Sequence, residues 1–210
     1  MREGHVFVVN GDLTLLACDS VIVPTDYKRS VRKYWGRWHG VSVPEWQSST
    51  KRVSRSVKVG DQLVRYLNVG ATQAPADLEW LRAGLAEGLA AAGAELMGAP
   101  HAPLQTRERP LLGMPVIGVG GGGFDAMRGR ALRVLLDEAA IAANTGFDVA
   151  IMCKWRSDYA ALQSQRGQGD WEGALATVFM EADNLGDSAR QGSLAMFLGA
   201  GVSKAAGLPD

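Results

Sequence analysis

Apolar and polar residues follow two different periods along this chain, and segments with one period alternate with segments with the other. Short β-branched or apolar runs predict strands, and longer stretches with apolar residues at spacings of three and four predict helices. The expected strands cover residues 5–9, 20–23, 63–70, 112–119 and 148–154. The expected helices cover residues 76–98, 128–144, 158–165 and 171–182. Strands that alternate with helices indicate an α/β fold with a mostly parallel central sheet flanked by helices.

Two residues fit the ends of predicted helices. Asp77 stands just before Leu78, where its carboxylate can cap the first helix. Gly146 follows the 128–144 helix at the place where a C-terminal glycine belongs. These residues support the expected bounds of the two helices.

A glycine run lies between the predicted strand 112–119 and the helix 128–144. It comprises Gly118 and residues 120–123, and Phe124 follows it. Glycine leaves backbone N–H groups open to phosphate oxygens, and a helix N-terminus adds partial positive charge. Open α/β sheets bind ligands at the carboxyl ends of their strands. The run therefore predicts a site for a phosphate-bearing small molecule, and an ordinary flexible turn is the alternative.

The C-terminal part of the chain changes in composition. Residues 166–170 read Arg-Gly-Gln-Gly-Asp, which is typical of a linker. We expect a domain over residues 1–165, a linker with an amphipathic helix over 166–193, and the start of a truncated domain over 194–210. The last segment has an isolated strand and a glycine turn, so we expect the chain to be a fragment of a longer protein.

Composition and charge narrow the function classes. The chain has 210 residues, 47% of them hydrophobic, and its 22 Lys and Arg balance 22 Asp and Glu, so its net charge supports neither nucleic-acid nor membrane binding. The apolar runs are short and no signal peptide begins the sequence, so we expect a cytoplasmic protein. Cys18 and Cys153 are expected to be buried and reduced. Neither they nor His5, His39 and His101 have metal-ligand spacing, so no metal is expected.

Two stretches resemble parts of macro domains, the ADP-ribose-binding α/β modules. Val8-Val9-Asn10-Gly11-Asp12-Leu13-Thr14, followed by a strand ending at Pro24, is similar to their opening. Residues 115–125, with the following helix and the strand at 149–152, resemble their diphosphate-binding loop and its flanking elements. The resemblance covers residues 5–165 and implies a three-layer macro-like fold.

The resemblance also implies a ligand, ADP-ribose or an NAD-related nucleotide. The carboxylate of Asp12 would accept a hydrogen bond from the adenine amino group, Asp26 would contact a ribose, and the Phe124 ring would pack against the distal ribose. The glycine main chain would wrap the diphosphate. The implied ligand-binding residues are Asp12, Leu13, Asp26, Gly118, Gly120, Gly121, Gly122, Gly123 and Phe124. A plain turn residue remains the alternative for Asp12.

One departure from the family concerns catalysis. Macro domains usually follow the second strand with an Asn-Ala-Ala-Asn segment, whereas this chain has Pro24-Thr25-Asp26-Tyr27. The asparagine and glycine positions that support ADP-ribosyl hydrolysis in some members are missing. We therefore expect binding without turnover and no catalytic residue in this chain. An ADP-ribosyl hydrolase is kept as an alternative.

The last residues resemble a second family. Gly199-Ala200-Gly201-Val202-Ser203, with residues 206–210, is similar to the first NAD-binding motif of sirtuin-type Rossmann domains. This resemblance implies that Gly199, Ala200, Gly201 and Ser203 bind the cofactor. The whole arrangement resembles bacterial NAD-consuming defence proteins. It implies a nucleotide sensor that regulates an attached sirtuin-type NAD hydrolase or deacylase.

Basic and aromatic residues alternate over residues 27–58. The cations are Lys28, Arg29, Arg32, Lys33, Arg37, Lys51, Arg52, Arg55 and Lys58, and Tyr34, Trp35 and Trp38 lie among them. A solvated or docking surface is the favoured interpretation, and a ligand-free interaction domain is accordingly the alternative to a nucleotide sensor. A lid over the nucleotide is the second interpretation. Single-stranded nucleic acid is the least favoured partner, and a homo-oligomer is left open.

Overall fold

The computed structural model of the chain describes residues 3–69, 77–98, 103–119, 123–166 and 172–193. The chain divides into two compact units, Met1–Arg166 and Gly167–Asp210. The described part of the second unit comprises the helix α4, Glu172–Arg190, and residues 191–193. The helix continues well past the expected end at residue 182. The predicted sirtuin-type motif, with Gly199, Ala200, Gly201 and Ser203, lies outside the described residues.

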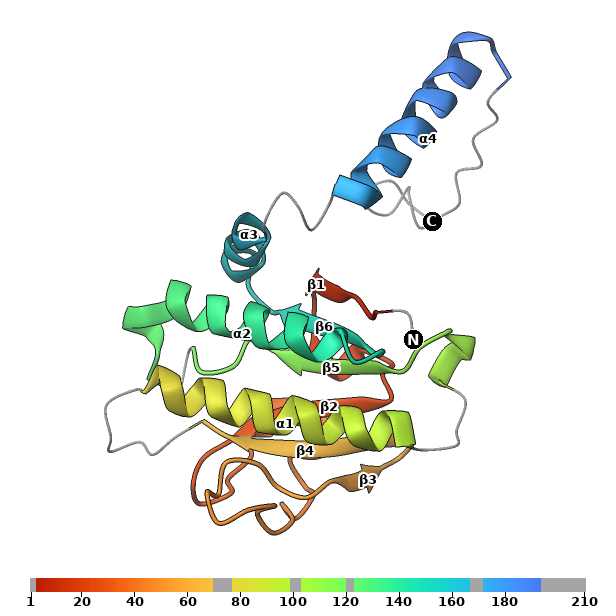
Figure 1. Ribbon diagram of the computed structural model, residues 1–210. Coiled ribbons are helices and arrows are strands. Elements are labelled where there is room, and N and C mark those ends of the chain that lie inside the picture. The colour runs from red at the N-terminus through yellow and green to blue at the C-terminus, as the bar shows by residue number, and fades with distance from the viewer. Residues whose placement is uncertain (1–2, 70–76, 99–102, 120–122, 167–171, 194–210) are drawn as a thin grey trace, which may run out of the picture. The chain divides into compact units, whose positions relative to one another are not determined.

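A six-stranded sheet forms the centre of the first unit (Figure 1). Its strands are β1 Val6–Asn10, β2 Ser20–Thr25, β3 Val57–Val59, β4 Gln62–Asn68, β5 Leu111–Pro115 and β6 Asp148–Cys153. They lie in the order β1-β6-β5-β2-β4-β3, and every neighbouring pair is parallel except β3 with β4. This arrangement confirms the predicted α/β class with a mostly parallel sheet.

Three helices cover one face of this sheet: α1 Leu78–Gly98, α2 Arg128–Ala143 and α3 Arg156–Gln165. Both predicted helix ends are confirmed. The N–H of Glu79 donates to Asp77 Oδ1 at 2.9 Å, and Gly146 takes a φ of +111° just after α2. In the left-handed region glycine carries no steric penalty.

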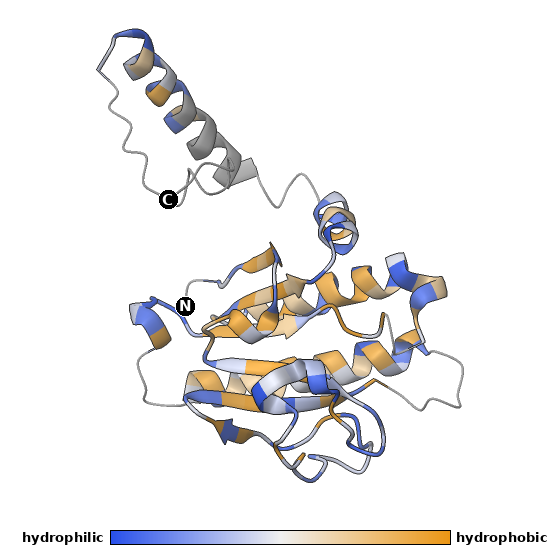
Figure 2. Cartoon of the chain, turned by 180° about the vertical axis from the view of Figure 1, so that it is seen from behind, coloured by the Kyte–Doolittle hydropathy of each residue, from blue (hydrophilic) through white to orange (hydrophobic). Residues whose placement is uncertain are grey.

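The opposite face is covered by short 3-10 turns and loops, as the rear view in Figure 2 shows. The 3-10 turns in the unit are η1 Leu13–Leu15, η2 Lys33–Trp38, η3 Leu104–Thr106 and η4 Asp125–Met127. Trp35 and Trp38, from η2, pack with Val31 and Val43 against strand residues such as Tyr66 in a second core. These two tryptophans therefore serve packing.

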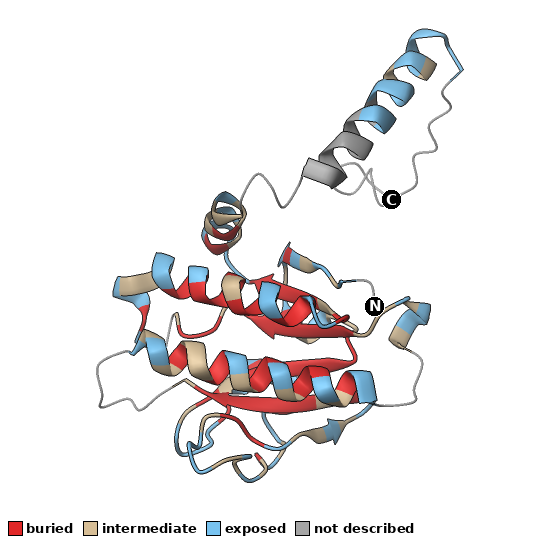
Figure 3. Ribbon diagram, in the orientation of Figure 1, coloured by how far each residue is buried: buried red, intermediate tan, exposed pale blue. Residues whose placement is uncertain are grey.

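The two cores bury the central strands on both sides, which Figure 3 shows as a red sheet between exposed covers. Strand β5 ends at Pro115, earlier than the predicted residue 119. The next residue still donates from Val116 N to Met152 O at 3.2 Å, and the chain then turns at Gly118, whose φ is +89°. The last residues of the predicted strand thus form the base of the glycine loop.

Candidate functional site

The carboxyl edge of the sheet gathers the predicted site residues. Strands β1, β6, β5 and β2 are adjacent and parallel, so the residues that follow them meet at one edge. Asp12 follows β1, Gly118 follows β5 and Asp26 follows β2. Ligands of open parallel sheets bind at this edge. The topology therefore brings together two carboxylates and the glycine loop, although they lie far apart in the sequence.

Asp12 is exposed and has a structural role of its own. Its Oδ1 accepts hydrogen bonds from Thr14 N and Thr14 Oγ1, both at 2.8 Å, and so caps η1. Within the described part of the chain, both hydrogen bonds to this carboxylate end on Oδ1. Because a carboxylate can accept several more hydrogen bonds, Oδ2 can still receive one from a ligand.

Leu13 and Phe124 turn their side chains into the cores. Leu13 is 2% exposed and Phe124 has no exposed surface. The expectation that the Phe124 ring packs against a ribose is therefore wrong for this structure. The ring fills the space that Gly118 leaves, since a Cβ there would lie 2.8 Å from Phe124 Cδ2. Only the main chain of Leu13 and Phe124 can face a ligand.

The described ends of the glycine loop close on each other. Phe124 N donates to Gly118 O at 3.2 Å. Gly118 and Gly123 have φ values of +89° and +84°, which favour glycine. The predicted diphosphate contacts Gly120, Gly121 and Gly122 lie outside the described residues. The two ends of the loop are therefore hydrogen-bonded to each other, and the backbone turns at Gly118 and at Gly123.

Asp26 forms a compact turn after β2. Its Oδ1 accepts from Ser30 N at 2.8 Å, and its carbonyl oxygen accepts from Arg29 N at 2.9 Å. The hydroxyl of Thr25 donates to Ser30 O at 3.0 Å. These bonds hold residues 25–30 in one fixed turn directly after β2. A hydrogen-bonded aspartate turn thus occupies this part of the edge.

An ion pair connects the start of α2 with α3. Arg128, the first residue of α2, donates from Nε to Asp158 Oδ1 at 2.6 Å and from Nη2 to Asp158 Oδ2 at 2.8 Å. Asp158 is 2% exposed. The hydrogen bonds with Asp158 raise the pKa of Arg128 above its usual value. This pair, which the sequence reasoning missed, fixes where α2 starts after the glycine loop.

Two exposed aromatic rings lie at the same edge, and the sequence analysis missed Trp155 while it named Tyr34 only as part of the basic and aromatic segment. Trp155 follows β6 and is 61% exposed, and Tyr34 of η2 is 59% exposed. The ammonium of Lys154 lies 5.8 Å from the Tyr34 ring centroid and 5.7 Å from that of Trp155. Such rings can stack on a nucleotide base. The position of Trp155 directly after a predicted parallel strand was the available signal.

The two thiols are not part of this chemistry. Cys18 and Cys153 are both buried and free. Burial raises the pKa of the Cys153 thiol from 9.0 to about 12 and that of Cys18 to about 11. A thiol that stays protonated at neutral pH is a poor nucleophile and metal ligand. Among the described residues, no group of three or more His, Cys, Asp and Glu is placed to hold a metal ion.

Known structures share this fold. A macrodomain from Trypanosoma brucei superimposes with a TM-score of 0.53 at 15% sequence identity, and covers 78% of this chain and 67% of its own. The chain has the macrodomain fold. The same Trypanosoma brucei macrodomain in complex with ADP-ribose gives a TM-score of 0.52 at 17% identity, with 78% and 69% of the two chains covered. A mutant macrodomain from Oceanobacillus iheyensis gives 0.50 at 12% identity, with 75% and 88% covered.

Sequence comparisons add no relative. No protein-family model matches the chain, and no curated protein matches it. No helix in the part of the chain that the structure describes is long and apolar enough to cross a membrane.

Proposed function

We propose that residues 1–165 bind ADP-ribose or a closely related nucleotide at the carboxyl edge of the sheet. One observation carries the proposal: Asp12, Asp26, Trp155 and the glycine loop follow four neighbouring parallel strands and so share one edge. Each of these residues and the loop can contact one part of such a ligand. The fold is that of macrodomains, one of which was solved in complex with ADP-ribose.

Each residue has a role in the proposed complex. Oδ2 of Asp12 accepts from the adenine amino group, and the exposed ring of Trp155 stacks on the base beside it, since β1 and β6 are neighbours. Backbone N–H groups of the glycine loop hold the diphosphate together with the start of α2. The Asp26 turn lies at the ribose. Binding without hydrolysis is proposed because Thr25-Asp26-Tyr27 stands where macro domains carry their asparagines.

The finer part of the proposal concerns regulation. In this part of the proposal, binding of the nucleotide regulates an attached sirtuin-type domain that consumes NAD. The reason is that NAD cleavage releases ADP-ribose-type molecules. This part is supported by the resemblance of residues 199–210 alone. It requires a coupling free energy between the nucleotide site and the sirtuin-type site.

Isothermal titration calorimetry with ADP-ribose tests the proposal. Asp12→Ala removes one charged acceptor, so we expect the affinity to fall by about tenfold to a hundredfold. Gly122→Glu puts a negative side chain into the loop and should abolish binding. Trp155→Ala removes a stacking ring from an exposed position and should cost about tenfold.

Asp148→Ala is the matched control. Asp148 Oδ1 also accepts a backbone N–H, from His5 at 2.8 Å, but Asp148 begins β6 at the opposite edge of the sheet. Circular dichroism checks that each variant is folded. The proposal is wrong if folded wild-type protein shows no binding heat at millimolar ADP-ribose, or if Asp148→Ala weakens binding as much as Asp12→Ala.

A further inference from the structure

The positive charge of this chain is concentrated on one segment. Residues 27–58 hold nine of its 22 Lys and Arg, with Glu45 as the single acidic residue among them. The remainder of the chain is therefore acidic on balance, although the total is zero. A local excess of this size creates a field that the net charge of the chain does not report.

The structure exposes these cations and leaves them without acidic partners. Eight of the nine are exposed, and Arg52 is half-buried. None of the nine forms an ion pair with a described carboxylate. Elsewhere in the first unit, Arg65, Arg82, Arg107 and Arg128 each pair with an aspartate or a glutamate. The segment thus presents positive charge that no described carboxylate neutralises.

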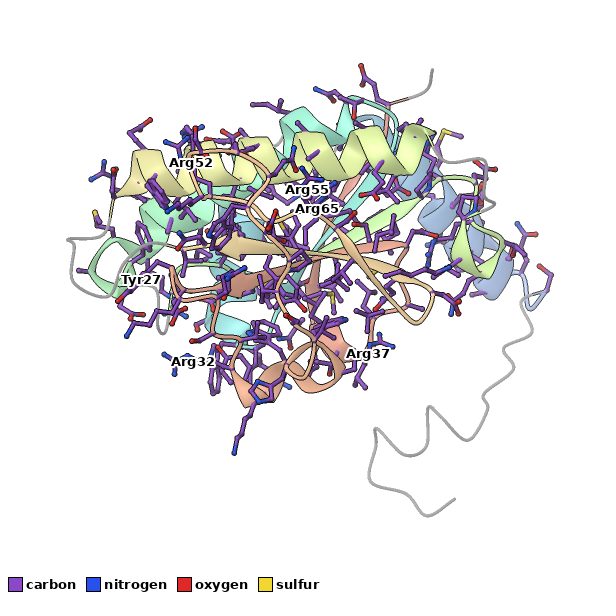
Figure 4. All side chains as sticks on the ribbon, turned by 90° about the horizontal axis from the view of Figure 1, so that it is seen from below. Tyr27, Arg32, Arg37, Arg52, Arg55 and Arg65 are labelled. Carbon is purple, nitrogen blue, oxygen red and sulfur yellow. The ribbon has the colours of Figure 1, made fainter. Side chains whose placement is uncertain are left out.

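The cations form a band around the β4–β3 edge of the sheet. Arg37 lies on η2 and Arg32 directly precedes it, and η2 covers the face opposite the helices. Arg52 stands over the Trp80 ring of α1, 4.8 Å from its centroid. Figure 4 shows Arg32 and Arg37 at one side of the lower surface and Arg52 and Arg55 at the other, beside α1. A band of this kind suits an extended polymer better than a compact ligand.

Exposed rings accompany the band. Tyr27 is 45% exposed and Tyr34 is 59% exposed, and each has a lysine ammonium within 6 Å of its ring, Lys28 and Lys154 respectively. A positively charged track with exposed aromatic rings is how proteins hold single-stranded nucleic acid, through phosphate contacts and base stacking. We propose that the surface formed by residues 27–58, which we name the basic band, binds single-stranded nucleic acid.

The surface chemistry argues for this partner over a protein or a membrane. Stable protein interfaces need an apolar core, and membrane-surface segments insert aliphatic or Trp side chains. Tyr27 and Tyr34 are the large hydrophobic residues exposed on the basic band, and no aliphatic one joins them in this fully described segment. Trp35 and Trp38 are buried in the core and are not available for insertion. Single-stranded nucleic acid, the least favoured partner from the sequence alone, is therefore the partner that the structure favours.

Fluorescence anisotropy with a labelled oligodeoxythymidine of about 20 nucleotides tests the proposal. We compare the full chain with the triple variant Arg32→Gln/Lys33→Gln/Arg55→Gln, whose side chains are exposed and form no hydrogen bond with a described residue. Each lost phosphate contact should lower the slope of log Kd against log salt by about 0.7, so the slope should fall by about 2. The affinity at low salt should fall at least tenfold.

Two further variants separate charge from stacking. Arg130→Gln/Arg133→Gln/Arg190→Gln removes three exposed arginines outside the basic band and should leave both the affinity and the slope unchanged. Tyr34→Ala should weaken binding by about tenfold without changing the slope, because stacking releases no counterion. Tyr34→Phe should restore it.

Three results would overturn the proposal: no anisotropy change at about 50 mM salt, an equal loss in the arginine control, or equal affinity for a duplex of the same length. Calorimetry of the basic-band triple variant with ADP-ribose keeps the two proposals apart. Loss of oligonucleotide binding with unchanged ADP-ribose binding supports the basic band as a separate surface.

Discussion

Single residues in this fold follow one electrostatic rule, which is that a buried carboxylate is paired. Asp19 accepts from Leu111 N and from Arg107 Nη2, and Glu138 accepts from Arg82 Nη1 at 2.7 Å. Both carboxylate oxygens of Asp158 accept a hydrogen bond from the Arg128 guanidinium. Burying a charge is costly unless it is paired and hydrogen-bonded, so removing the partner costs more than the pair contributes.

We predict that Arg128→Met lowers the free energy of unfolding by about 2 kcal/mol, below the range for a fully buried pair because Arg128 is partly exposed. Urea denaturation measures the change. Arg133→Met removes an exposed arginine from the same helix and should change the free energy by less than about 0.5 kcal/mol. Equal effects of the two substitutions would mean that the Arg128–Asp158 pair does not hold α2 against α3.

Elements pack closely where helix α1 carries glycine. A Cβ at Gly93 would lie 2.4 Å from Cε1 of Phe147, a side chain that is 1% exposed and has no room to retreat. A Cβ at Gly98, at the end of the same helix, would meet nothing within 4 Å. Glycine disfavours a helix, so its retention at residue 93 is explained by contact with the ring.

Gly93→Ala should therefore lower the free energy of unfolding by about 1–2 kcal/mol, since overpacking outweighs a helix-propensity gain of about 1 kcal/mol. Gly98→Ala should leave it unchanged or raise it slightly. Thermal and urea denaturation of the two variants provide the comparison. A stabilised Gly93→Ala protein would show that α1 can shift away from Phe147 at little cost.

At the scale of the whole molecule, both apolar cores that the described residues form lie in the first unit. Every residue of the two core clusters precedes residue 163, and the last helix of that unit ends at Gln165. Arg166 adds a hydrogen bond from Nη2 to Val6 O at 3.0 Å. The described residues whose burial stabilises the sheet therefore all belong to the first unit.

A chain truncated after Arg166 should fold cooperatively, with a Tm within about 3 °C of the first transition of the full chain, which corresponds to no more than about 1 kcal/mol for a unit of this size. Calorimetric unfolding of both chains tests the expected boundary at 165. A truncated chain without a cooperative transition would show that residues beyond 166 contribute to its stability.

Much of the fold could be predicted because the residues that decide it are local. The strand and helix periods, the Asp77 cap and Gly146 all act within a few residues of where they stand. The three-residue strand β3 was missed, since a pattern that short has no readable period. The end of β5 was misplaced because apolar residues 116–119 continue past Pro115, where the ladder stops.

The sequence by itself determined the α/β class, the position of the glycine loop and the excess of charge over residues 27–58, because each depends on neighbours in the chain. Only the tertiary structure decided which strand ends are adjacent, and so that Asp12, Trp155 and the loop share an edge. It also decided that Phe124, Trp35 and Trp38 belong to the cores while the cations among them are exposed. The physical reason is that burial and strand order depend on contacts between residues far apart in sequence, which no local pattern contains.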